Sequence, residues 1–443
     1  MNLKKACLRN SALKDLKILV AIFCGVLSTL LPVRSSDNPN VKIGYRPIKG
    51  PAPVPRPTPA IDEIPKGYPA DNGVDEAKLI DLAKWIKSNP NLKIYSVLIS
   101  KNGKLILELY TPGLKRDDNH YMMSITKSIL ADIVGIAIDK KKIPSETTYL
   151  DKLIPEKLFP NNSVKQKFSK FSLKDVLGMQ CLDVEDTDDS SNQQYWFGAD
   201  NRLKYVLTSP TQNPAKKSLK YTQQTTAIAS GILSYRTGLS AFDFGQEFLF
   251  KPLGFKNAEW CHQDRTGIES GSAGLRLRPI DMHKIGILHL QNGKWNNKQI
   301  ISQEFVYKTS MPYSRYDPKN PWYSPNDVYA YYWWQYTFGT MLKWQCASGW
   351  MGQLLAINRD TNIVVSITGY CGNGEQDKIM KDYVIPAIYP IRKPNRIQNY
   401  DEVVKSVNVG NSRIPSDQPY RFTPSTVWKI GGESRVKFTG LDK

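Results

Sequence analysis

Two strand hairpins, far apart in the chain, constrain its fold more than any other feature. Residues 95–110, "YSVLISKNGKLILELY", are two β-rich runs joined at Asn102 and Gly103, a pair typical of tight hairpin turns. Residues 353–369, "QLLAINRDTNIVVSITG", are two apolar runs joined by "NRDTN". Because the chain between them is largely helical, we predict a mixed α/β (α+β) fold whose sheet is assembled from both ends of the chain.

Helical spacing of apolar residues fills the region between the hairpins and also precedes the first of them. The predicted helices are residues 74–88, 124–141, 172–179, 225–238 and 278–293. These positions place an α/β lobe at 67–120 and 271–392, with an inserted all-α lobe at 121–270.

The two ends of the chain differ in composition from the folded part. A basic start followed by the apolar run 18–31 is typical of an export signal. That run is short for a transmembrane helix, so residues 1–37 are predicted to be either a signal peptide or an N-terminal anchor. Residues 38–66 are proline-rich and predict an extended linker, and 393–443 form a polar tail. We therefore expect an exported protein, periplasmic or extracellular, with residues 18–31 as the alternative membrane anchor.

The chain is strongly basic, with a formal net charge of +19. Such a charge would suit nucleic acid, anionic membranes or an acidic cell-wall polymer. The basic residues are scattered, however, and the sequence holds no zinc-finger or RNP-type signature. We expect no nucleic-acid partner, whereas contact with an anionic cell envelope stays open. With four histidines and no zinc-like cysteine spacing, the sequence predicts no metal and no cofactor.

Export would place Cys181, Cys261, Cys346 and Cys371 in an oxidising compartment. Cys346 and Cys371 flank the hairpin of residues 353–369, and pairing of its strands would bring them nearly opposite each other. We therefore predict a disulfide between Cys346 and Cys371, and the pairing of the other two stays open.

A Ser-x-x-Lys pattern occurs three times, beginning at Ser11, Ser124 and Ser434, so the pattern alone has little weight. Only Ser124 follows a polar loop, residues 115–121, and opens a strongly periodic helix. Unpaired N–H groups at a helix start favour a developing oxyanion, and Lys127 lies on the same face of the first turn. Either Ser124 is a nucleophile with Lys127 as its base, or Ser124 caps the helix while Lys127 faces solvent.

Two more segments are candidates for the same site. Tyr221 stands just before a helix, where a phenol could relay a proton or simply pack. Residues 346–357, "CASGWMGQLLAI", are glycine-rich before an apolar strand, where a backbone N–H could stabilise an oxyanion or form an ordinary hairpin turn. The sequence has no Gly-x-Ser-x-Gly pentapeptide and no phosphate-binding Gly-rich loop, which disfavours a histidine-based triad and nucleotide hydrolysis.

In this order and at these separations, the three motifs resemble the serine β-lactamase-like superfamily. The nearer resemblance is to its class C branch, which contains esterases, D-amino-peptidases and 6-aminohexanoate-dimer hydrolases. Phrases such as "LKDVLGMQC" and "LFKPLGFKNAEW" support it over roughly residues 67–390. The resemblance implies a β-lactamase/transpeptidase-like fold, with an antiparallel sheet flanked by helices and an active site between the sheet and the all-α lobe.

The resemblance also assigns roles to particular residues. Ser124 would be the nucleophile, Lys127 its base, and Tyr221 an aid to proton transfer. The backbone N–H groups of Ser124 and Trp350 would form the oxyanion hole. The substrate-binding candidates are Gln223, Ser348, Gly349 and Trp196.

Two departures from the family pattern bear on the substrate. Gln223 replaces the asparagine of the family's Tyr-x-Asn motif, and Ala347 replaces the cationic or imidazole residue that opens its third motif. That third motif helps to hold the substrate carboxylate in penicillin-recognising members. We therefore predict an exported serine hydrolase that cleaves a small ester, amide or peptide through an acyl-Ser124 intermediate. A D-Ala peptidase or β-lactamase is one alternative, and a catalytically silent cell-wall or partner-binding module is another.

An acidic run at residues 183–189 lies in the segment that borders the family's cleft. It could attract a substrate that carries an ammonium group. The alternative is a solvated surface loop.

Overall fold

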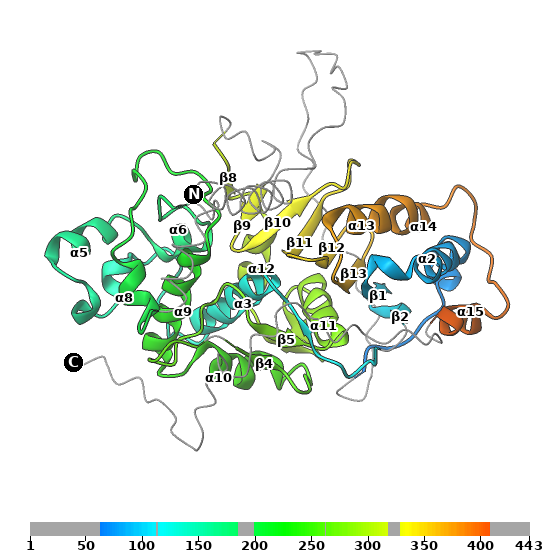
Figure 1. Cartoon of the computed structure of the whole chain (residues 1–443), viewed down its shortest axis with the longest axis horizontal. Coiled ribbons are helices and arrows are strands. Elements are labelled where there is room, and N and C mark those ends of the chain that lie inside the picture. Colours follow the sequence, from blue (N-terminus) through cyan, green and yellow to red (C-terminus); the bar gives the residue numbers. More distant parts are fainter. Residues whose placement is uncertain (1–62, 112–113, 185–198, 262, 318–327, 408–443) are drawn as a thin grey trace, which may run out of the picture.

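The computed structural model of this chain describes residues 63–111, 114–184, 199–261, 263–317 and 328–407 (Figure 1). At its centre is one large antiparallel sheet. Its strands are β1 (Ile94–Lys101), β2 (Lys104–Tyr110), β8 (Ser314–Arg315), β9 (Val328–Ala330), β10 (Trp333–Tyr336), β11 (Trp344–Gly349), β12 (Gln353–Asn358) and β13 (Ile363–Gly369). They are ordered β2-β1-β13-β12-β11-β10-β9-β8. The sheet is thus built from both ends of the chain, as predicted.

Both predicted hairpins are present and lie side by side. The turn between β1 and β2 has φ values of 53° at Asn102 and 75° at Gly103, which is the left-handed backbone that tight hairpins need. β1 pairs with β13 along its length, with Val97 opposite Ile367. The pairing of β1 with β13 therefore joins segments that are more than half the chain apart.

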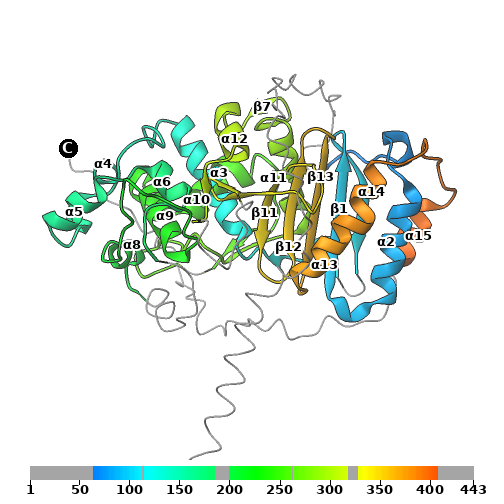
Figure 2. The same ribbon diagram turned by 90° about the horizontal axis from the view of Figure 1, so that it is seen from above.

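Helices cover both faces of the sheet (Figure 2). Along β12, Leu355 and Ile357 join one buried cluster, whereas Leu354 and Ala356 join the other, because successive side chains of a strand point to opposite faces. The first face is covered by α3 (Ile125–Asp139) and α11 (Pro279–Leu290). The second is covered by α2 (Glu76–Ser88), α14 (Ile385–Ile388) and α15 (Tyr400–Val407).

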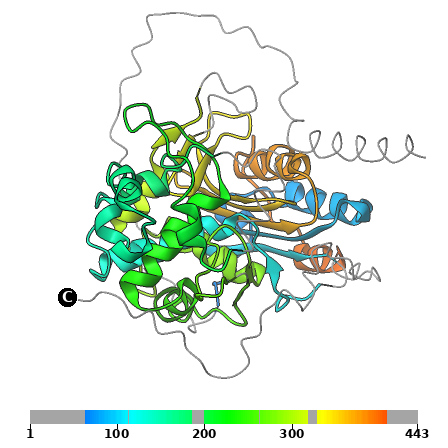
Figure 3. The ribbon, with the colours of Figure 1, turned by 60° about the vertical axis from the view of Figure 1, so that its left-hand side comes forward.

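A group of helices packs at the β8 end of the sheet, and Figure 3 brings it forward. Its helices are α4 (Leu150–Leu153), α5 (Asn162–Phe168), α6 (Leu173–Leu177), α8 (Arg202–Val206), α9 (Gln223–Thr237) and α10 (Ala241–Gly245). The central one is α9, which contacts α3, α6, α8 and α10. A Cβ on Gly231 would lie 2.6 Å from the Leu203 side chain, so this glycine lets α8 approach α9 closely.

Shorter elements link these layers. They are β3 (His120–Tyr121), β4 (Glu259–Trp260), β5 (Leu275–Leu277), β6 (Lys294–Trp295), β7 (Lys298–Gln299), α12 (Gln303–Ser310) and α13 (Asn373–Lys378). Three 3-10 helices, η1 (Ala70–Asn72), η2 (Pro90–Leu92) and η3 (Glu156–Leu158), and two π-helices, η4 (Gln246–Phe250) and η5 (Ile379–Val384), complete them. β3 pairs with β5, and Met122 N–H then donates to Leu275 O at 2.9 Å. The backbone that leads into α3 is therefore held by the segment before α11.

The predicted disulfide between Cys346 and Cys371 is wrong. Cys346 lies on β11, opposite Ala356 of β12, so β12 separates it from the β13 strand that precedes Cys371. All four cysteines in the described part of the chain are free. The hairpin was predicted correctly, but Cys346 belongs to a third strand and not to the hairpin.

The folded unit extends beyond the predicted limits of 67 and 392. Ile64 is buried, and Tyr400 of α15 donates from its hydroxyl to Ile106 O at 3.1 Å. Residues 1–37, most of the linker 38–66 and residues 408–443 lie outside the described ranges, so their assignments stay predictions. Within those ranges, no helix has the length and apolarity needed to cross a bilayer.

Candidate active site

Ser124 stands at the start of α3, shortly after β3. Ser124 occupies the N-cap position of α3, but its side chain makes no capping hydrogen bond to the helix. The residue before it, Met123, has a φ of 47°, which is uncommon for a residue with a side chain. Unfavourable backbone conformations of this kind cluster at functional sites.

Lys127 is completely buried, so the alternative that it faces solvent is wrong. Its Nζ lies 2.8 Å from Ser124 Oγ, 3.0 Å from Gln223 Oε1 and 3.0 Å from Ser272 O. A neutral amine has two N–H groups and one lone pair. It can donate to Gln223 and Ser272 while it accepts the Ser124 proton, which is the arrangement that a general base requires.

Tyr221 lies beside this lysine. Lys127 Nζ is 5.0 Å from the centroid of the Tyr221 ring, and the Trp334 ring stacks on Tyr221 with centroids 5.4 Å apart. Thr222 caps α9 by accepting from Gln224 N, so the helix start fixes the backbone between Tyr221 and Gln223. Tyr221 therefore packs against its neighbours and also lies beside Lys127. The two alternatives for this residue, packing and proton relay, are compatible.

The glycine-rich hairpin between β11 and β12 reaches the start of α3. A Cβ on Gly349 would lie 2.6 Å from Met122 O and 3.1 Å from Met123 Cβ, so only glycine permits this close approach. The Gln353 side chain donates to Met351 O at 3.0 Å and to Gly369 O at 2.6 Å, which secures the turn. This contact holds Gly349 against the backbone that precedes Ser124.

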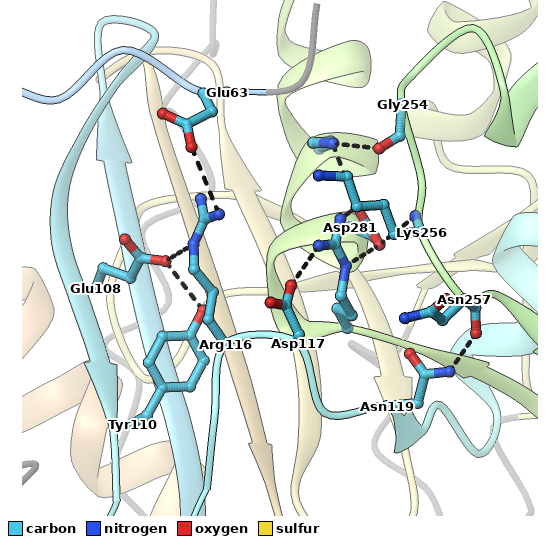
Figure 4. A network of polar contacts seen from close by, with 12 residues as sticks. Glu63, Glu108, Tyr110, Arg116, Asp117, Asn119, Gly254, Lys256, Asn257 and Asp281 are labelled. Carbon is cyan, nitrogen blue, oxygen red and sulfur yellow. Dashed lines mark hydrogen bonds and ion pairs between the residues drawn. The ribbon is translucent and has the colours of Figure 1, made fainter.

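A polar network fixes the segment that leads to Ser124 (Figure 4). Arg116 Nε donates to Glu108 Oε1 of β2 at 2.6 Å. Asp117 accepts from Arg278 Nη1 at 2.7 Å, and Arg278 also binds both carboxylate oxygens of Asp281 on α11. The hydrogen bond from Arg278 holds the pKa of Asp117 below its usual value. Residues 114–121 are thereby tied to both the sheet and α11.

We compared the chain with known proteins. No family model matches it. A curated relative, the 6-aminohexanoate-dimer hydrolase of Paenarthrobacter ureafaciens, is 23% identical over 256 residues, which are 54% of this chain and 63% of that protein. The match thus spans less than two thirds of the relative.

Several solved structures have a similar fold. A "Putative 6-aminohexanoate-dimer hydrolase from Bacillus anthracis" aligns with a TM-score of 0.58 and 19% identity, covering 75% of this chain and 89% of that one. The octameric penicillin-binding protein homologue from Pyrococcus abyssi has a TM-score of 0.54 and 14% identity, with coverages of 72% and 78%. The D-stereospecific amidohydrolase from Streptomyces has a TM-score of 0.54 and 13% identity, with coverages of 70% and 98%.

The chain has the fold of the serine β-lactamase-like superfamily. The predicted fold class, an antiparallel sheet flanked by helices with a helical insertion, is therefore confirmed, as is the resemblance read from the motifs. In this β-lactamase-like fold, the structure brings Ser124, Lys127, Tyr221 and Gln223 together, with Gly349 against the backbone before Ser124. The oxyanion-hole role of Ser124 and Trp350 and the substrate-binding role of Ser348 stay predictions.

Other predicted residues fall elsewhere. Trp196 and most of the acidic run lie outside the described residues. Asp183, at the start of that run, forms an ion pair with Lys220 at 3.0 Å. In the part of the chain that the structure describes, no three His, Cys, Asp or Glu side chains are grouped to hold a metal ion.

One feature of the β-lactamase-like fold here was missed by sequence reasoning. Gln345 Nε2 of β11 donates to His289 Nδ1 at 3.1 Å, so His289 Nε2 carries the proton and donates to Asp132 Oδ1 of α3 at 3.0 Å. All three side chains are buried, and burial raises the pKa of Asp132. The chain of contacts ties α3, which begins beside Ser124, to the strand that carries Gly349. No local sequence signal marks it, because its members come from three distant elements.

Proposed function

We propose that this protein is an exported serine hydrolase that cleaves an ester or amide bond of a linear substrate through an acyl-Ser124 intermediate. The observation that carries the proposal is the 2.8 Å contact between Lys127 Nζ and Ser124 Oγ, in a site where the lysine is fully buried. Export is supported by the basic start and the apolar run 18–31 of the sequence.

The reaction would proceed in two stages. Lys127 takes the proton of Ser124 while Ser124 Oγ attacks the carbonyl carbon, and the backbone N–H groups of Ser124 and Trp350 stabilise the oxyanion. Tyr221, beside Lys127, assists return of that proton to the departing alcohol or amine. Water then attacks the acyl-enzyme, and Ser124 recovers its proton.

The third motif favours a linear substrate over a penicillin. Ala347 occupies the position of the cationic or imidazole residue of penicillin-recognising members, and its side chain is fully buried on β11. It therefore offers no charge to a substrate carboxylate. The curated relative is named for hydrolysis of a 6-aminohexanoate dimer, which is consistent with a linear amide.

The test is hydrolysis of 4-nitrophenyl butyrate by the full chain and by Ser124→Ala. We expect the wild type to turn the ester over and Ser124→Ala to lose a factor of about 10³ or more in kcat/KM. A folded wild type with no turnover of esters or amides would favour the binding module. Stable labelling by a fluorescent penicillin would favour the cell-wall peptidase instead.

A further inference from the structure

One end of the large sheet is formed by turns and lies away from Ser124. β11 begins at this end with Trp344 and finishes at Gly349, which contacts the backbone before Ser124. A strand of this length covers about 17 Å, so this end is remote from the candidate active site. We call it the turn end of the sheet, and it consists of residues 101–104, 291–299, 337–343, 359–362 and 389–393.

Hydrogen bonds join the hairpin turns of the turn end to one another. Asn102 N–H, between β1 and β2, donates to Asn362 O between β12 and β13 at 2.9 Å. Asn358 Nδ2, at the end of β12, donates to Lys343 O at 3.0 Å. Lys343 closes the turn between β10 and β11, so three hairpin turns form one continuous surface.

Two further segments extend this surface. Arg359 Nη1 donates to Asn292 Oδ1 at 3.1 Å, which adds the turn after α11. Figure 2 shows α14 running back along the sheet towards the turn end, and residues 389–393 follow that helix directly. Burial and, to a smaller extent, the carboxylate of Asp360 raise the pKa of Tyr389. The segment after α14 therefore lies near the turn between β12 and β13.

The turn end is strongly positive. Its residues include eight Lys and Arg side chains and a single carboxylate, that of Asp360. Six of the eight cations are exposed, and within the described part of the chain no ion pair joins any of these six to a carboxylate. They are Lys104, Lys294, Lys298, Lys343, Arg392 and Lys393. A surface with this imbalance attracts a polyanion.

Apolar side chains stand among these cations. Ile391 and Met341 are almost completely exposed, and Tyr389 is about half exposed. Single exposed apolar residues are common on proteins, but Ile391 is followed directly by Arg392 and Lys393. A hydrated polyanion offers no apolar region to such side chains, whereas the boundary between the headgroups and acyl chains of a bilayer does. The combination therefore favours a lipid surface over nucleic acid or an acidic polymer.

We propose that the turn end of the sheet binds the surface of an anionic lipid bilayer. Ile391 and Met341 enter the headgroup boundary, and the six exposed cations face the lipid phosphates. Because Ser124 lies near the opposite end of β11, the candidate active site stays away from the bilayer and open to substrates in solution. The proposal depends neither on the proposed hydrolase function nor on the predicted role of residues 18–31.

Co-sedimentation of the full chain with vesicles tests the proposal. One vesicle is phosphatidylcholine alone, and the other has about a third of phosphatidylglycerol. The readout is the ratio of the two partition coefficients, compared between variants, since the N-terminal residues are the same in all of them. Lys343→Gln combined with Lys393→Gln should lower this ratio by about 25-fold, or about fivefold for each cation. An unchanged ratio would overturn the proposal.

A matched control removes two charges elsewhere. Lys157 and Lys170 are exposed lysines of the helical group, and Lys157→Gln with Lys170→Gln should leave the ratio close to that of the wild type. An equal loss in this control overturns the proposal, because the effect would then be one of overall charge. Circular dichroism checks that each variant is folded.

Two further measurements identify the partner and the docking face. Ile391→Ser keeps every charge and should weaken binding to the anionic vesicles about fivefold. No effect of Ile391→Ser, with polyphosphate bound as tightly as the vesicles, would mean a hydrated polyanion and overturn the lipid assignment. Hydrogen exchange in residues 389–393 should slow on anionic vesicles, whereas exchange in residues 349–352 should not change. Vesicle binding without that protection would place the contact elsewhere and overturn the proposal.

Discussion

Among the residues that the structure describes, two lysines are completely buried, and their surroundings differ. Lys127 contacts three uncharged oxygens, those of Ser124, Gln223 and Ser272. Lys284 on α11 donates to Leu253 O at 2.9 Å and Gly254 O at 3.0 Å, and it lies 3.3 Å from the carboxylate of Asp281.

The difference is the one that the proposed function requires between a reactive lysine and a structural one. A carboxylate next to Lys284 compensates an ammonium ion, so this side chain fastens α11 to the turn after η4 through a buried ion pair. The partners of Lys127 include a hydroxyl that can give up a proton. Burial of a lysine is therefore no evidence for catalysis by itself. The chemical nature of its partners is what distinguishes the two sites.

The largest expected effect is on activity at Lys127. Lys127→Met keeps the length and buried character of the side chain but removes the base, so ester hydrolysis should fall by a factor of about 10³ or more. Circular dichroism should show the fold retained. Lys284→Met serves as the matched control. The folded molecules of this variant should have a kcat close to that of the wild type. Comparable losses of kcat in both variants would contradict the difference in role between Lys127 and Lys284.

The converse effect is on stability at Lys284. Lys284→Met leaves Asp281 with Arg278 as its remaining ion-pair partner, and two carbonyls lose their donor. We expect the free energy of unfolding to drop by about 3 kcal/mol, as for other broken buried pairs, measured by urea denaturation. If the midpoint does not move, Lys284 is not the structural cation described here.

A third expectation concerns how closely β11 approaches α3. Gly349→Ala places a Cβ within 2.6 Å of Met122 O, so the hairpin must shift away from Ser124. A displacement of about 1 Å should lower kcat by about 10²-fold. The melting temperature should change little. Gly374→Ala is the matched control, because a Cβ there meets no atom within 4 Å. Full activity in Gly349→Ala would show that the approach is not needed.

The smallest expected effect is a pH dependence next to the structural lysine. His283 lies buried between Ser100 and Ser366, and burial lowers its pKa to about 3. At a pH below about 6.5, the ordinary pKa of histidine, His283 binds a proton in the unfolded chain but not in the folded chain. The free energy of unfolding therefore decreases as the pH is lowered. Lowering the pH from 7 to 5 should reduce the free energy of unfolding by about 2 kcal/mol through His283 alone.

His283→Gln tests this dependence, since the variant cannot take up that proton in either state. The change in unfolding free energy between pH 7 and pH 5 should be smaller in the variant by about the same 2 kcal/mol. His120, whose burial lowers its pKa to about 4, is present in both proteins and cancels in the difference. Parallel pH profiles would mean that His283 is not held neutral.

Much of the fold was predictable from the sequence because its signals are local. Asn102 and Gly103 mark one hairpin, and apolar spacing marks α3, α9 and α11. The joining of distant segments was harder, as Cys346 shows: the sequence placed it beside Cys371, but strand order puts β12 between them. The packing of α15 on β2 was missed because residues 400–407 are polar overall and bury only one face.

The candidate site was partly predictable for the same reason. Ser124 and Lys127 lie one helical turn apart, so their contact follows from local geometry. Ser272 contributes a backbone carbonyl, which any residue type could supply. The stacking of Trp334 on Tyr221 depends on where β10 lies in the sheet, and strand order of that kind is not encoded in short motifs.

The most direct test of Lys127 as the base is the rate at which a fluorophosphonate probe labels Ser124, followed by mass spectrometry of the peptide that contains it. Wild type and Lys284→Met should be labelled at Ser124 at similar rates, and Lys127→Met at least about 100-fold more slowly. Labelling of Lys127→Met at the wild-type rate, or modification of wild type at a residue other than Ser124, would contradict the assignment.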